Sequence, residues 1–351
     1  MRTVGIVLLT TLMIFASCGR SENKSLSVRV PVDSVGFAVT AKQMDSVMAR
    51  LERVPLQTDY TEPWIGCISP HDDYQYVNNI YPAILGNIKS GTVILFGVAH
   101  KAATLGLSDS LVFDSHESWS GPYGNVKISP LREEIMRLLN KGYYTVSDPM
   151  HNIEHSLESM VPFLQYYNRD VEIVPILVPY MSPQRMRETG IELAGVISEI
   201  IAEKSLVPGK DISIVITSDA VHYGTEDWGS NDYAWFGCDQ AGNEMALARE
   251  NEIIDNCLVG EITDEKIALF SNYTLSEDDF RVYNWSWCGR YSIPVGLYTL
   301  SHLKGITLPP GKLVAYSTSI INQHIDFTDI GMGVTAIATD CHWVGYPAIG
   351  F

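Results

Sequence analysis

The 351-residue chain lacks the short motifs that mark several large enzyme classes. It contains no G-x-S-x-G nucleophile elbow, no G-x-G-x-x-G dinucleotide fingerprint and no P-loop, which argues against serine hydrolysis, dinucleotide binding and P-loop nucleotide chemistry. Cysteine is also scarce, with six residues in all and no C-x-x-C pair. Neither a zinc ribbon nor a thioredoxin motif is therefore present.

Basic residues are few. The chain has 24 Lys and Arg against 41 Asp and Glu, a formal net charge of -17 at pH 7. No basic stripe and no interleaving of aromatic with basic residues offsets this balance. We therefore predict that nucleic acid is not a partner.

The apolar run near the N-terminus, residues 4–16, is too short to cross a bilayer comfortably. It follows Arg2 and ends in small residues directly before Cys18. This segment resembles a bacterial lipoprotein signal peptide, so that residues 1–17 would be removed and Cys18 would carry the lipid. An ordinary secretory signal and an uncleaved anchor are the alternatives. The prediction is an extracytoplasmic protein, on the periplasmic or cell-surface side, that touches the membrane through its lipid alone.

An extracytoplasmic compartment permits disulfide bonds. The compartment allows a pair among four scattered cysteines, and the sequence does not choose which: Cys67, Cys238, Cys257 and Cys341.

Hydrophobic residues make up 46% of the chain, enough for a large core. Apolar runs alternate with segments of helical periodicity, which predicts an α/β fold: one domain with a mixed β-sheet sandwiched by helices. We expect residues 18–60 to be a tether with a lead-in helix and residues 61–351 to be this domain. Helices are predicted over 40–54, 77–88, 131–139, 156–167, 183–204, 242–256, 261–271 and 293–303, a hairpin over 119–129, and antiparallel closing strands over 312–320 and 331–338.

Three of the apolar runs end on a histidine. The runs that begin at Trp64, Thr92 and Ile212 lead to His71, His100 and His222. Ligands of open α/β sheets bind outside the carboxyl ends of the strands, so these histidines are expected to converge on one site. For each alone, a satisfied polar residue at a strand end is the simpler interpretation.

Three further groups could do chemistry. Asp219 lies three residues before His222 and could orient the imidazole and raise its basicity for acid/base catalysis, although an Asx-turn would explain the same pattern. His155 and Glu158, three residues apart, would share one helix face and could line one pocket. Cys288 precedes a predicted helix and Arg290, both of which would favour a thiolate.

Several short motifs together resemble the Memo family: S-P-H-D-D-Y at 69–74, F-G-V-A-H at 96–100, S-D-A-V-H-Y-G at 218–224 and C-G-R at 288–290. They occur in the family's order across nearly the whole domain. This family resembles class III extradiol dioxygenases, enzymes with a non-haem iron in a mixed α/β sandwich. The resemblance implies a metal held by His71, His100 and Cys288, with Asp219 and His222 in the pocket. Iron is the first expectation for this metal, with copper or zinc as alternatives.

The chain departs from the family's usual P-H-A-G-Y, because Asp72 and Asp73 follow the first ligand. Such carboxylates would favour harder cations or a cationic group on the substrate. The predicted substrate pocket combines residues near the three ligands: Asp72, Asp73, Tyr74, His155, Glu158 and Arg290.

The leading hypothesis is a lipid-anchored, Memo-like metalloprotein with dioxygenase-like oxidoreductase chemistry, in which His222 and Asp219 move protons. A non-catalytic protein that binds a peptide or small ligand in the same pocket is one alternative. A metal-assisted hydrolase is another, because a bound metal lowers the pKa of water. A small-molecule or peptide ligand is expected in each case, and the oligomeric state stays open.

Overall fold

The computed structural model describes residues 27–54, 60–225 and 231–351. The predicted signal peptide, Cys18 and part of the tether lie outside these residues. Among the described helices, none has both the length and the apolar character needed to cross a membrane.

One large mixed sheet organises the fold, in the order β1-β5-β6-β8-β3-β9-β2-β12-β10, with β11 paired to β12, and β4 paired to β7 and β8. The strands are β1 (Val28–Arg29), β2 (Gly66–Ser69), β3 (Thr92–Val98), β4 (Leu111–Phe113), β5 (Ser118–Gly121), β6 (Gly124–Ile128), β7 (Tyr144–Val146), β8 (Glu172–Val178), β9 (Ile212–Thr217), β10 (His222–Gly224), β11 (Lys312–Thr318) and β12 (His342–Gly350).

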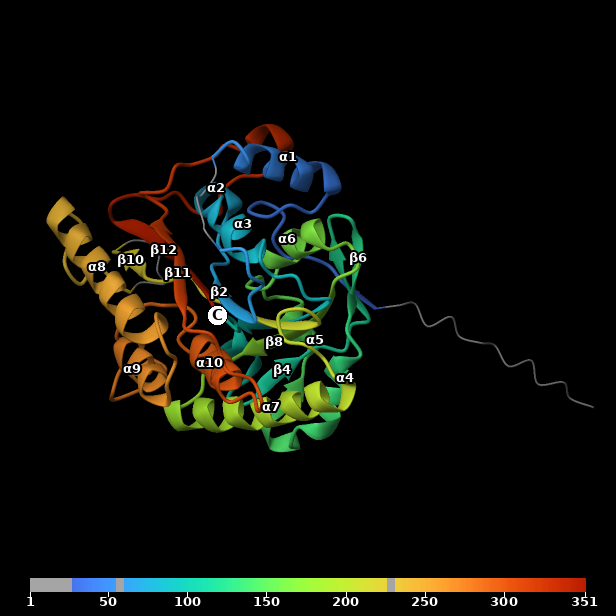
Figure 1. Cartoon of the computed structure of the whole chain (residues 1–351). Coiled ribbons are helices and arrows are strands. Elements are labelled where there is room, and N and C mark those ends of the chain that lie inside the picture. The colour runs from blue at the N-terminus through green and yellow to red at the C-terminus, as the bar shows by residue number, and fades with distance from the viewer. Residues whose placement is uncertain (1–26, 55–59, 226–230) are drawn as a thin grey trace, which may run out of the picture.

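Helices cover both faces of the sheet (Figure 1). They are α1 (Ala41–Leu51), α2 (Tyr74–Val77), α3 (Ile80–Leu85), α4 (Leu131–Leu138), α5 (Asp148–His151), α6 (Met160–Tyr167), α7 (Pro183–Lys204), α8 (Gln240–Ile253), α9 (Asp264–Thr274) and α10 (Ser292–Ser301). Short helical turns are η1 (Ala102–Leu105), η2 (Lys141–Tyr143), η3 (Ile254–Leu258) and η4 (Thr328–Ile330). The predicted α/β architecture with a mixed sheet between helices is confirmed.

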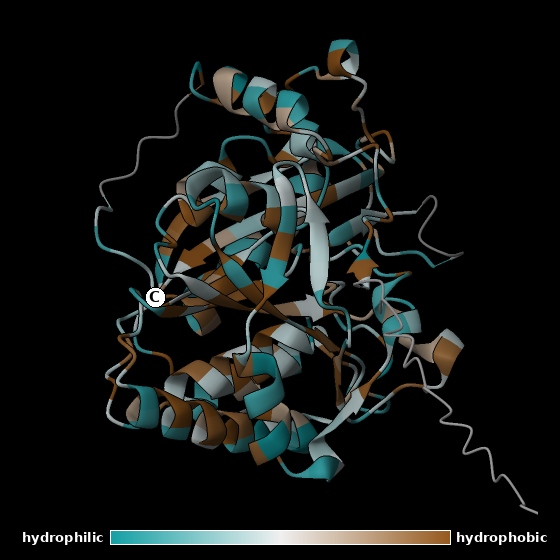
Figure 2. Cartoon of the chain, turned by 90° about the vertical axis from the view of Figure 1, so that its right-hand side faces the viewer, coloured by the Kyte–Doolittle hydropathy of each residue, from teal (hydrophilic) through white to brown (hydrophobic). Residues whose placement is uncertain are grey.

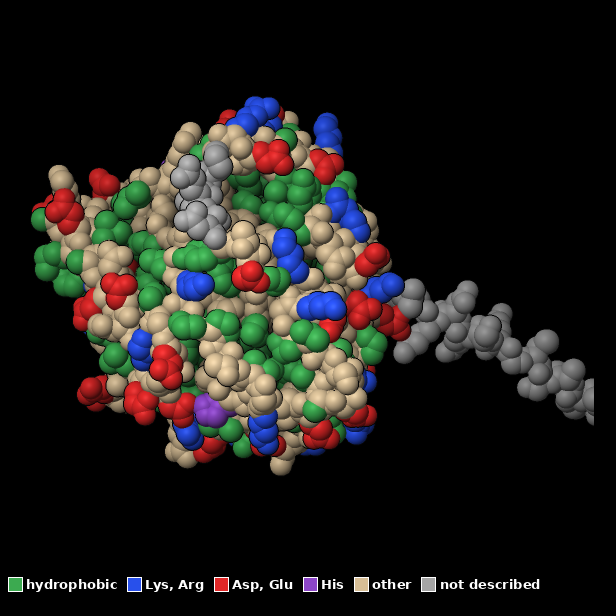
Figure 3. Space-filling model, viewed as in Figure 1, with side chains coloured by type: hydrophobic (Ala, Val, Ile, Leu, Met, Phe, Trp, Pro, Cys, Tyr) green, Lys and Arg blue, Asp and Glu red, His purple; other side chains and the backbone are tan. Residues whose placement is uncertain are grey.

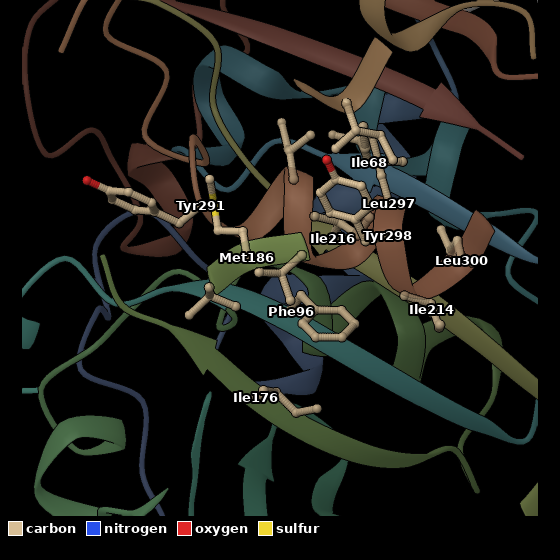
Figure 4. Close-up of a cluster of buried hydrophobic side chains, with 14 of the residues drawn as sticks. Ile68, Phe96, Ile176, Met186, Ile214, Ile216, Tyr291, Leu297, Tyr298 and Leu300 are labelled. Carbon is tan, nitrogen blue, oxygen red and sulfur yellow. The ribbon is translucent and has the colours of Figure 1, made fainter. Parts of the chain in front are cut away.

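The sheet separates two hydrophobic cores. On one face, α7 and α10 pack on the inner strands, where Phe96, Ile176, Ile214 and Leu297 are buried (Figure 4). On the other face, α1, α3 and α6 cover a second cluster that includes Tyr74, Leu95 and Phe163. The inner strands are accordingly hydrophobic along most of their length, whereas the outer helices alternate hydrophobic with hydrophilic residues (Figure 2).

Four parallel strands lie side by side at the centre, in the order β8, β3, β9 and β2. Because they run in the same direction, their carboxyl ends meet at one edge of the sheet. This edge carries the residues that the sequence singled out.

The predicted antiparallel pairing of the last strands is confirmed for β11 and β12, but the position predicted for the second one is wrong. No strand forms over 331–338; β12 instead covers His342–Gly350, is buried along its whole length, and pairs with β2, β10 and β11. Its Gly345, Pro347 and Gly350 are poor strand residues by local preference, and burial on both faces removes the alternation that identifies a strand.

The helix predicted over 77–88 is shorter in the structure, α3 over Ile80–Leu85, and a separate short helix, α2 (Tyr74–Val77), precedes it. Asn78, between them, has φ of +37°, a left-handed conformation that ends α2. Its side-chain amide donates to Gln323 O at 2.8 Å, which fastens the break to the C-terminal part of the chain.

Of the four cysteines considered, Cys238 and Cys341 form a disulfide, whereas Cys67 and Cys257 are free and buried. The bond joins the residue just before Asp239, the N-cap of α8, to the residue just before β12. It thus ties together two segments on the β10 side of the sheet.

Candidate metal centre

The central strands deliver three functional residues by the same local geometry. His71 lies two residues after β2, His100 two residues after β3 and Asp219 two residues after β9. Pro70 cannot donate to a sheet hydrogen bond, so the chain leaves β2 there and turns His71 toward the strand ends. The predicted convergence of strand-end residues is observed, with Asp219 in the place expected of the third histidine; His222 begins β10 instead.

The donor atoms of His71, His100 and Cys288 all lie within 4.8 Å of one another. His71 Nε2 is 3.5 Å from Cys288 Sγ, and the rings of the two histidines have centroids 5.4 Å apart. His71 and Cys288 are almost fully buried, whereas 29% of the His100 side chain is exposed. The structure therefore brings together the three residues predicted as ligands, and the group is accessible to solvent on the His100 side.

Cys288 reaches this position because Gly289 follows it. The Gly289 N–H donates to Ser218 Oγ at 3.0 Å, and a Cβ on Gly289 would lie 2.3 Å from that oxygen. Only glycine allows this approach between the loop before α10 and the end of β9. The Asp219 N–H, from the same strand end, donates to Cys288 Sγ at 3.1 Å.

The expectation that Arg290 would favour a Cys288 thiolate is wrong in this geometry. Burial raises the pKa of the Cys288 thiol well above its usual value. The Arg290 guanidinium instead donates to Arg281 O and stacks on Tyr283. A metal ion, rather than the arginine, is what would hold this sulfur as a thiolate.

Both candidate histidine ligands are oriented by a second residue. His71 Nδ1 lies 3.0 Å from Thr217 Oγ1, and His100 Nδ1 lies 2.9 Å from Glu154 Oε1. Glu154 Oε2 also accepts from the His100 backbone N–H at 2.7 Å. In each ring the Nδ1 is thereby occupied and the Nε2 is left for a metal, the arrangement usual in histidine metal sites.

The sequence analysis singled out His155 and Glu158 but missed Glu154. Burial alone would raise the pKa of Glu154, but the charge of His100 and the hydrogen bond with it outweigh burial and lower that pKa. The available signal was a carboxylate directly before a histidine at the start of a predicted helix.

Asp219 and His222 lie near Cys288, and donor atoms of the three residues are within 4.8 Å of one another. Asp219 Oδ1 accepts from the His71 N–H at 2.8 Å, and burial raises the pKa of this carboxyl to about 7. Burial, reinforced by His100 and His342, lowers the pKa of His222 to about 3. The expected rise in the basicity of His222 is therefore not observed.

A cavity of about 490 Å³ opens beside these residues. Of the predicted site, His71, Asp72, Asp73, His100, His155, Asp219 and His222 line it. Its other walls come from segments far apart in the chain: residues 32–37, residues 335–338, and the start of β12 with His342 and Trp343. His342 is a further residue that the sequence reasoning missed.

Three residues predicted for this pocket lie elsewhere. Tyr74 is buried among Phe37, Tyr81 and Phe163, and its hydroxyl donates to Ser159 O. Glu158 pairs with the buried Arg29 and accepts from the Val32 and Asp33 N–H groups. Arg290 lines a separate cavity.

The two unusual carboxylates, Asp72 and Asp73, belong to the wall of the first cavity and not to the ligand set. Asp72 accepts from the Tyr346 hydroxyl at 2.7 Å, and Asp73 accepts from the N–H and hydroxyl of Thr335. Burial, together with the charge of Asp219, raises the pKa of Asp72 to about 7, and burial with the charge of Asp72 raises that of Asp73 to about 8. Neither occurs in the donor groups that lie within 4.8 Å of one another among the described residues.

The donor set suits a borderline or redox metal. Burial and the neighbouring histidines lower the pKa of His71 well below its usual value, so this imidazole is neutral at physiological pH, the form that binds metals. Two imidazoles and one thiolate are ligands that zinc, copper and iron accept. The residues present therefore fit a metal ion with three protein ligands and an open position.

A model of Memo-like proteins matches residues 39–331, most of the chain. The chain belongs to the Memo-like family. Curated relatives include MEMO1 family proteins of Methanosarcina mazei, 29% identical over 167 residues, and of Aquifex aeolicus, 32% identical over 157 residues. These alignments cover 46% and 44% of this chain and 56% and 52% of the relatives. The chain thus spans about half the length of the curated relatives it matches.

Proposed function

We propose that this member of the Memo-like family is a metal-dependent oxidoreductase that acts on a small molecule at the edge of its central sheet. One observation carries the proposal: His71, His100 and Cys288 meet with donor atoms within 4.8 Å of one another, beside a cavity of about 490 Å³. A cavity of this size suits a small ligand.

A redox metal bound there would supply electron transfer and activation of an oxidant, and the protein residues do the rest. His71, His100 and Cys288 hold the metal, while Thr217 and Glu154 orient the two rings. His222 and Asp219 lie next to Cys288 on the cavity wall. The Asp219 carboxyl, with its pKa raised to about 7, can take a proton from a substrate hydroxyl and return it, and the neutral His222 can carry that proton between the two. Phe37, Trp343 and Val344 supply an apolar wall that limits access of water.

The metal content of the purified protein tests the proposal. We expect about one metal per chain in the wild type and its loss in His71→Ala, His100→Ala and Cys288→Ser, measured by elemental analysis. Iron or copper would support oxidation, whereas zinc would favour the hydrolase alternative. Unchanged metal content in all three variants would exclude this site and leave a ligand-binding protein.

The role of His222 requires a substrate, and catechols offered to iron-loaded protein with oxygen are the first screen. His222→Ala should keep its metal and its fold but lose about 10² to 10⁴ in turnover, the usual contribution of a general acid or base. Full activity of this variant from pH 5 to 9 would make His222 a structural residue.

We further propose that the protein is extracytoplasmic and anchored by lipid on Cys18. The Cys238–Cys341 disulfide supports this compartment, since such bonds persist mainly in oxidising environments. Cys18→Ala should move the protein from the membrane to the soluble fraction, because attached acyl chains provide the anchoring. A variant that is cleaved and still wholly in the membrane fraction would contradict lipid anchoring at this cysteine.

A further inference from the structure

A second cavity, of about 380 Å³, adjoins the proposed metal centre. Its walls include His100 and Cys288, two of the proposed ligands, together with Tyr180, which follows β8, and Tyr283 and Arg290. His100 lines both cavities, so the proposed metal position lies between them. Nothing in the proposed function uses this second space.

Arg290 is the charged group of this cavity that is held in place. The residue is 8% exposed, and its Nη2 donates to Arg281 O at 3.0 Å. The guanidinium carbon lies 3.4 Å from the centroid of the Tyr283 ring and 4.8 Å from that of Tyr291. Its Nε is buried and has no hydrogen-bond partner among the described residues.

The other arginines buried to this degree have carboxylate partners. Arg29 pairs with Glu158, and Arg132 pairs with Asp114 at 2.7 Å. Over the described ranges, no carboxylate lies within ion-pair distance of Arg290. A guanidinium stays protonated in proteins, and an uncompensated buried charge is costly. A positive charge kept at this position therefore indicates that a ligand supplies the negative one.

We propose that the second cavity binds an oxyanion, the carboxylate or phosphate group of a small molecule, through Arg290. The planar guanidinium matches either group because it can donate two parallel hydrogen bonds. Arg290 also precedes α10, whose N-terminal end carries the positive end of the helix dipole. Tyr180, Tyr283 and Tyr291 provide an aromatic wall for the remainder of the ligand.

The charges of the two cavities support this assignment. Asp33, Asp72, Asp73 and Asp219 line the first cavity, and no Lys or Arg of the described residues does, so this cavity offers an anion no cationic side chain of that kind. Arg281 and Arg290 line the second, and no Asp or Glu of the described residues contributes to its wall. An anionic ligand is therefore expected in the second cavity, where it would lie against His100 and Cys288.

Binding to Arg290 does not require the metal, so it can be measured on metal-free protein. Benzoate and inorganic phosphate are the probes, titrated by calorimetry, with uncharged benzamide as the matched control. We expect the wild type to bind at least one anion and to gain thermal stability from it, and not to bind benzamide. Failure to bind either anion at millimolar concentration would overturn the proposal, whatever the metal analysis shows.

Arg290→Met removes the charge with similar volume, and it should weaken anion binding about 30-fold or more, as expected on truncating a buried charge partner. Arg281→Met, at the exposed rim and paired with Asp279, should weaken it by less than about fivefold. Equal affinity of wild type and Arg290→Met would exclude Arg290 as the anion ligand.

Arg290→Lys keeps the charge without the planar fork and guards against a variant that fails to fold. We expect it to retain phosphate binding better than benzoate binding, because lysine acts as a point charge. In the absence of anion, Arg290→Met should melt no lower than wild type, whereas Arg29→Met should melt much lower because it strands Glu158.

An intrachain carboxylate outside the described residues is the competing explanation for the charge of Arg290. Glu226 and Asp227, in the undescribed segment 226–230, are the candidates that the sequence offers. In that case the Glu226→Gln/Asp227→Asn double variant would bind anions more tightly than wild type, and Arg290→Met would melt lower than wild type without any ligand. Those two results together would overturn the proposal.

Discussion

A single carboxylate, Glu154, sets the orientation of His100, one of the proposed metal ligands. It contacts both the backbone N–H and Nδ1 of His100, and it is 3% exposed, so solvent does not compete for these contacts. Outer partners of this kind fix the ring orientation and increase the basicity of the ligand. Glu154 is thus a positioning residue.

Glu154→Gln should lower metal affinity by about 10- to 100-fold, the usual effect of losing an outer-shell carboxylate. Competition with a chelator of known affinity measures this change. Retention of wild-type affinity would show that His100 is oriented by packing alone.

His100 belongs to two groups of possible metal ligands, one with His71 and Cys288 and the other with Glu154 and His155. A variant of His155 distinguishes between them. The His155 ring stacks on His100, with centroids 5.0 Å apart, and its side chain is 40% exposed. If His71, His100 and Cys288 hold the metal, His155→Gln should change affinity little beside Glu154→Gln. A larger loss in His155→Gln would move the metal to the second group.

At the scale of elements, Glu250 of α8 fastens the segment that carries Cys288. Its carboxylate accepts from Trp285 Nε1 at 2.5 Å, Trp287 Nε1 at 2.7 Å and the Tyr316 hydroxyl at 2.9 Å, and from the Val221 N–H. These donors belong to the loop before α10, to β11 and to the residue just before β10. One buried side chain therefore connects the segments on the β10 side of the metal centre.

Glu250→Ala should lower the free energy of unfolding by about 3 kcal/mol or more, because several buried donors lose their acceptor. Urea denaturation measures the change, and metal content should fall with it as the 285–288 segment loosens. The exposed Glu252, which pairs with Arg249, is the matched control, and Glu252→Gln should cost about 0 to 1 kcal/mol. Similar losses in both variants would contradict a specific role of Glu250.

Elements with a strong local pattern were predictable from the sequence. Residues 183–204 form α7 as predicted, since Ser182 caps the helix, Pro183 opens it and apolar residues recur on one face. β12 was not predictable in this way, because burial on both faces removes the alternating pattern. Ile337, in the stretch wrongly predicted as a strand, is 76% exposed.

The site was predictable where a strand end delivers the residue, as for His71 and His100. It was not predictable where tertiary packing decides, as for Glu154, which reaches back to His100 across 54 positions. The prediction that Tyr74 and Glu158 line the pocket is wrong for the same reason: proximity to a ligand in the sequence does not determine which way a side chain points.

At the scale of the whole molecule, the positions of the charged side chains say more about ligand selection than the net charge does. On the face drawn in Figure 3, acidic and basic side chains are interspersed with hydrophobic ones, and neither sign forms a continuous patch. The separation of charge occurs inside, where one cavity is lined by four aspartates and the other by two arginines. Selection among charged ligands is therefore expected at the cavities and not at this surface.

Buried histidines make the stability of the whole fold depend on pH, and His151 is the clearest case away from the metal centre. The residue is 1% exposed; its Nε2 lies 3.0 Å from Val112 O, and its own carbonyl accepts from Arg29. Burial lowers the pKa of His151 below its usual 6.5 and outweighs the charge of Asp114 and the hydrogen bond with Val112, which would raise it. The folded protein therefore keeps this imidazole neutral.

Because the unfolded chain binds the proton more readily, His151 contributes stability that is present above about pH 6.5 and lost as pH falls through the lowered folded value. Urea denaturation of metal-free protein between pH 4 and 8 should show this fall. His151→Gln should lose stability at pH 7.5 yet show a shallower decline toward acid, whereas His302→Gln, at a partly exposed site, should follow the wild-type curve. An unchanged slope in His151→Gln would assign the acid sensitivity to other groups.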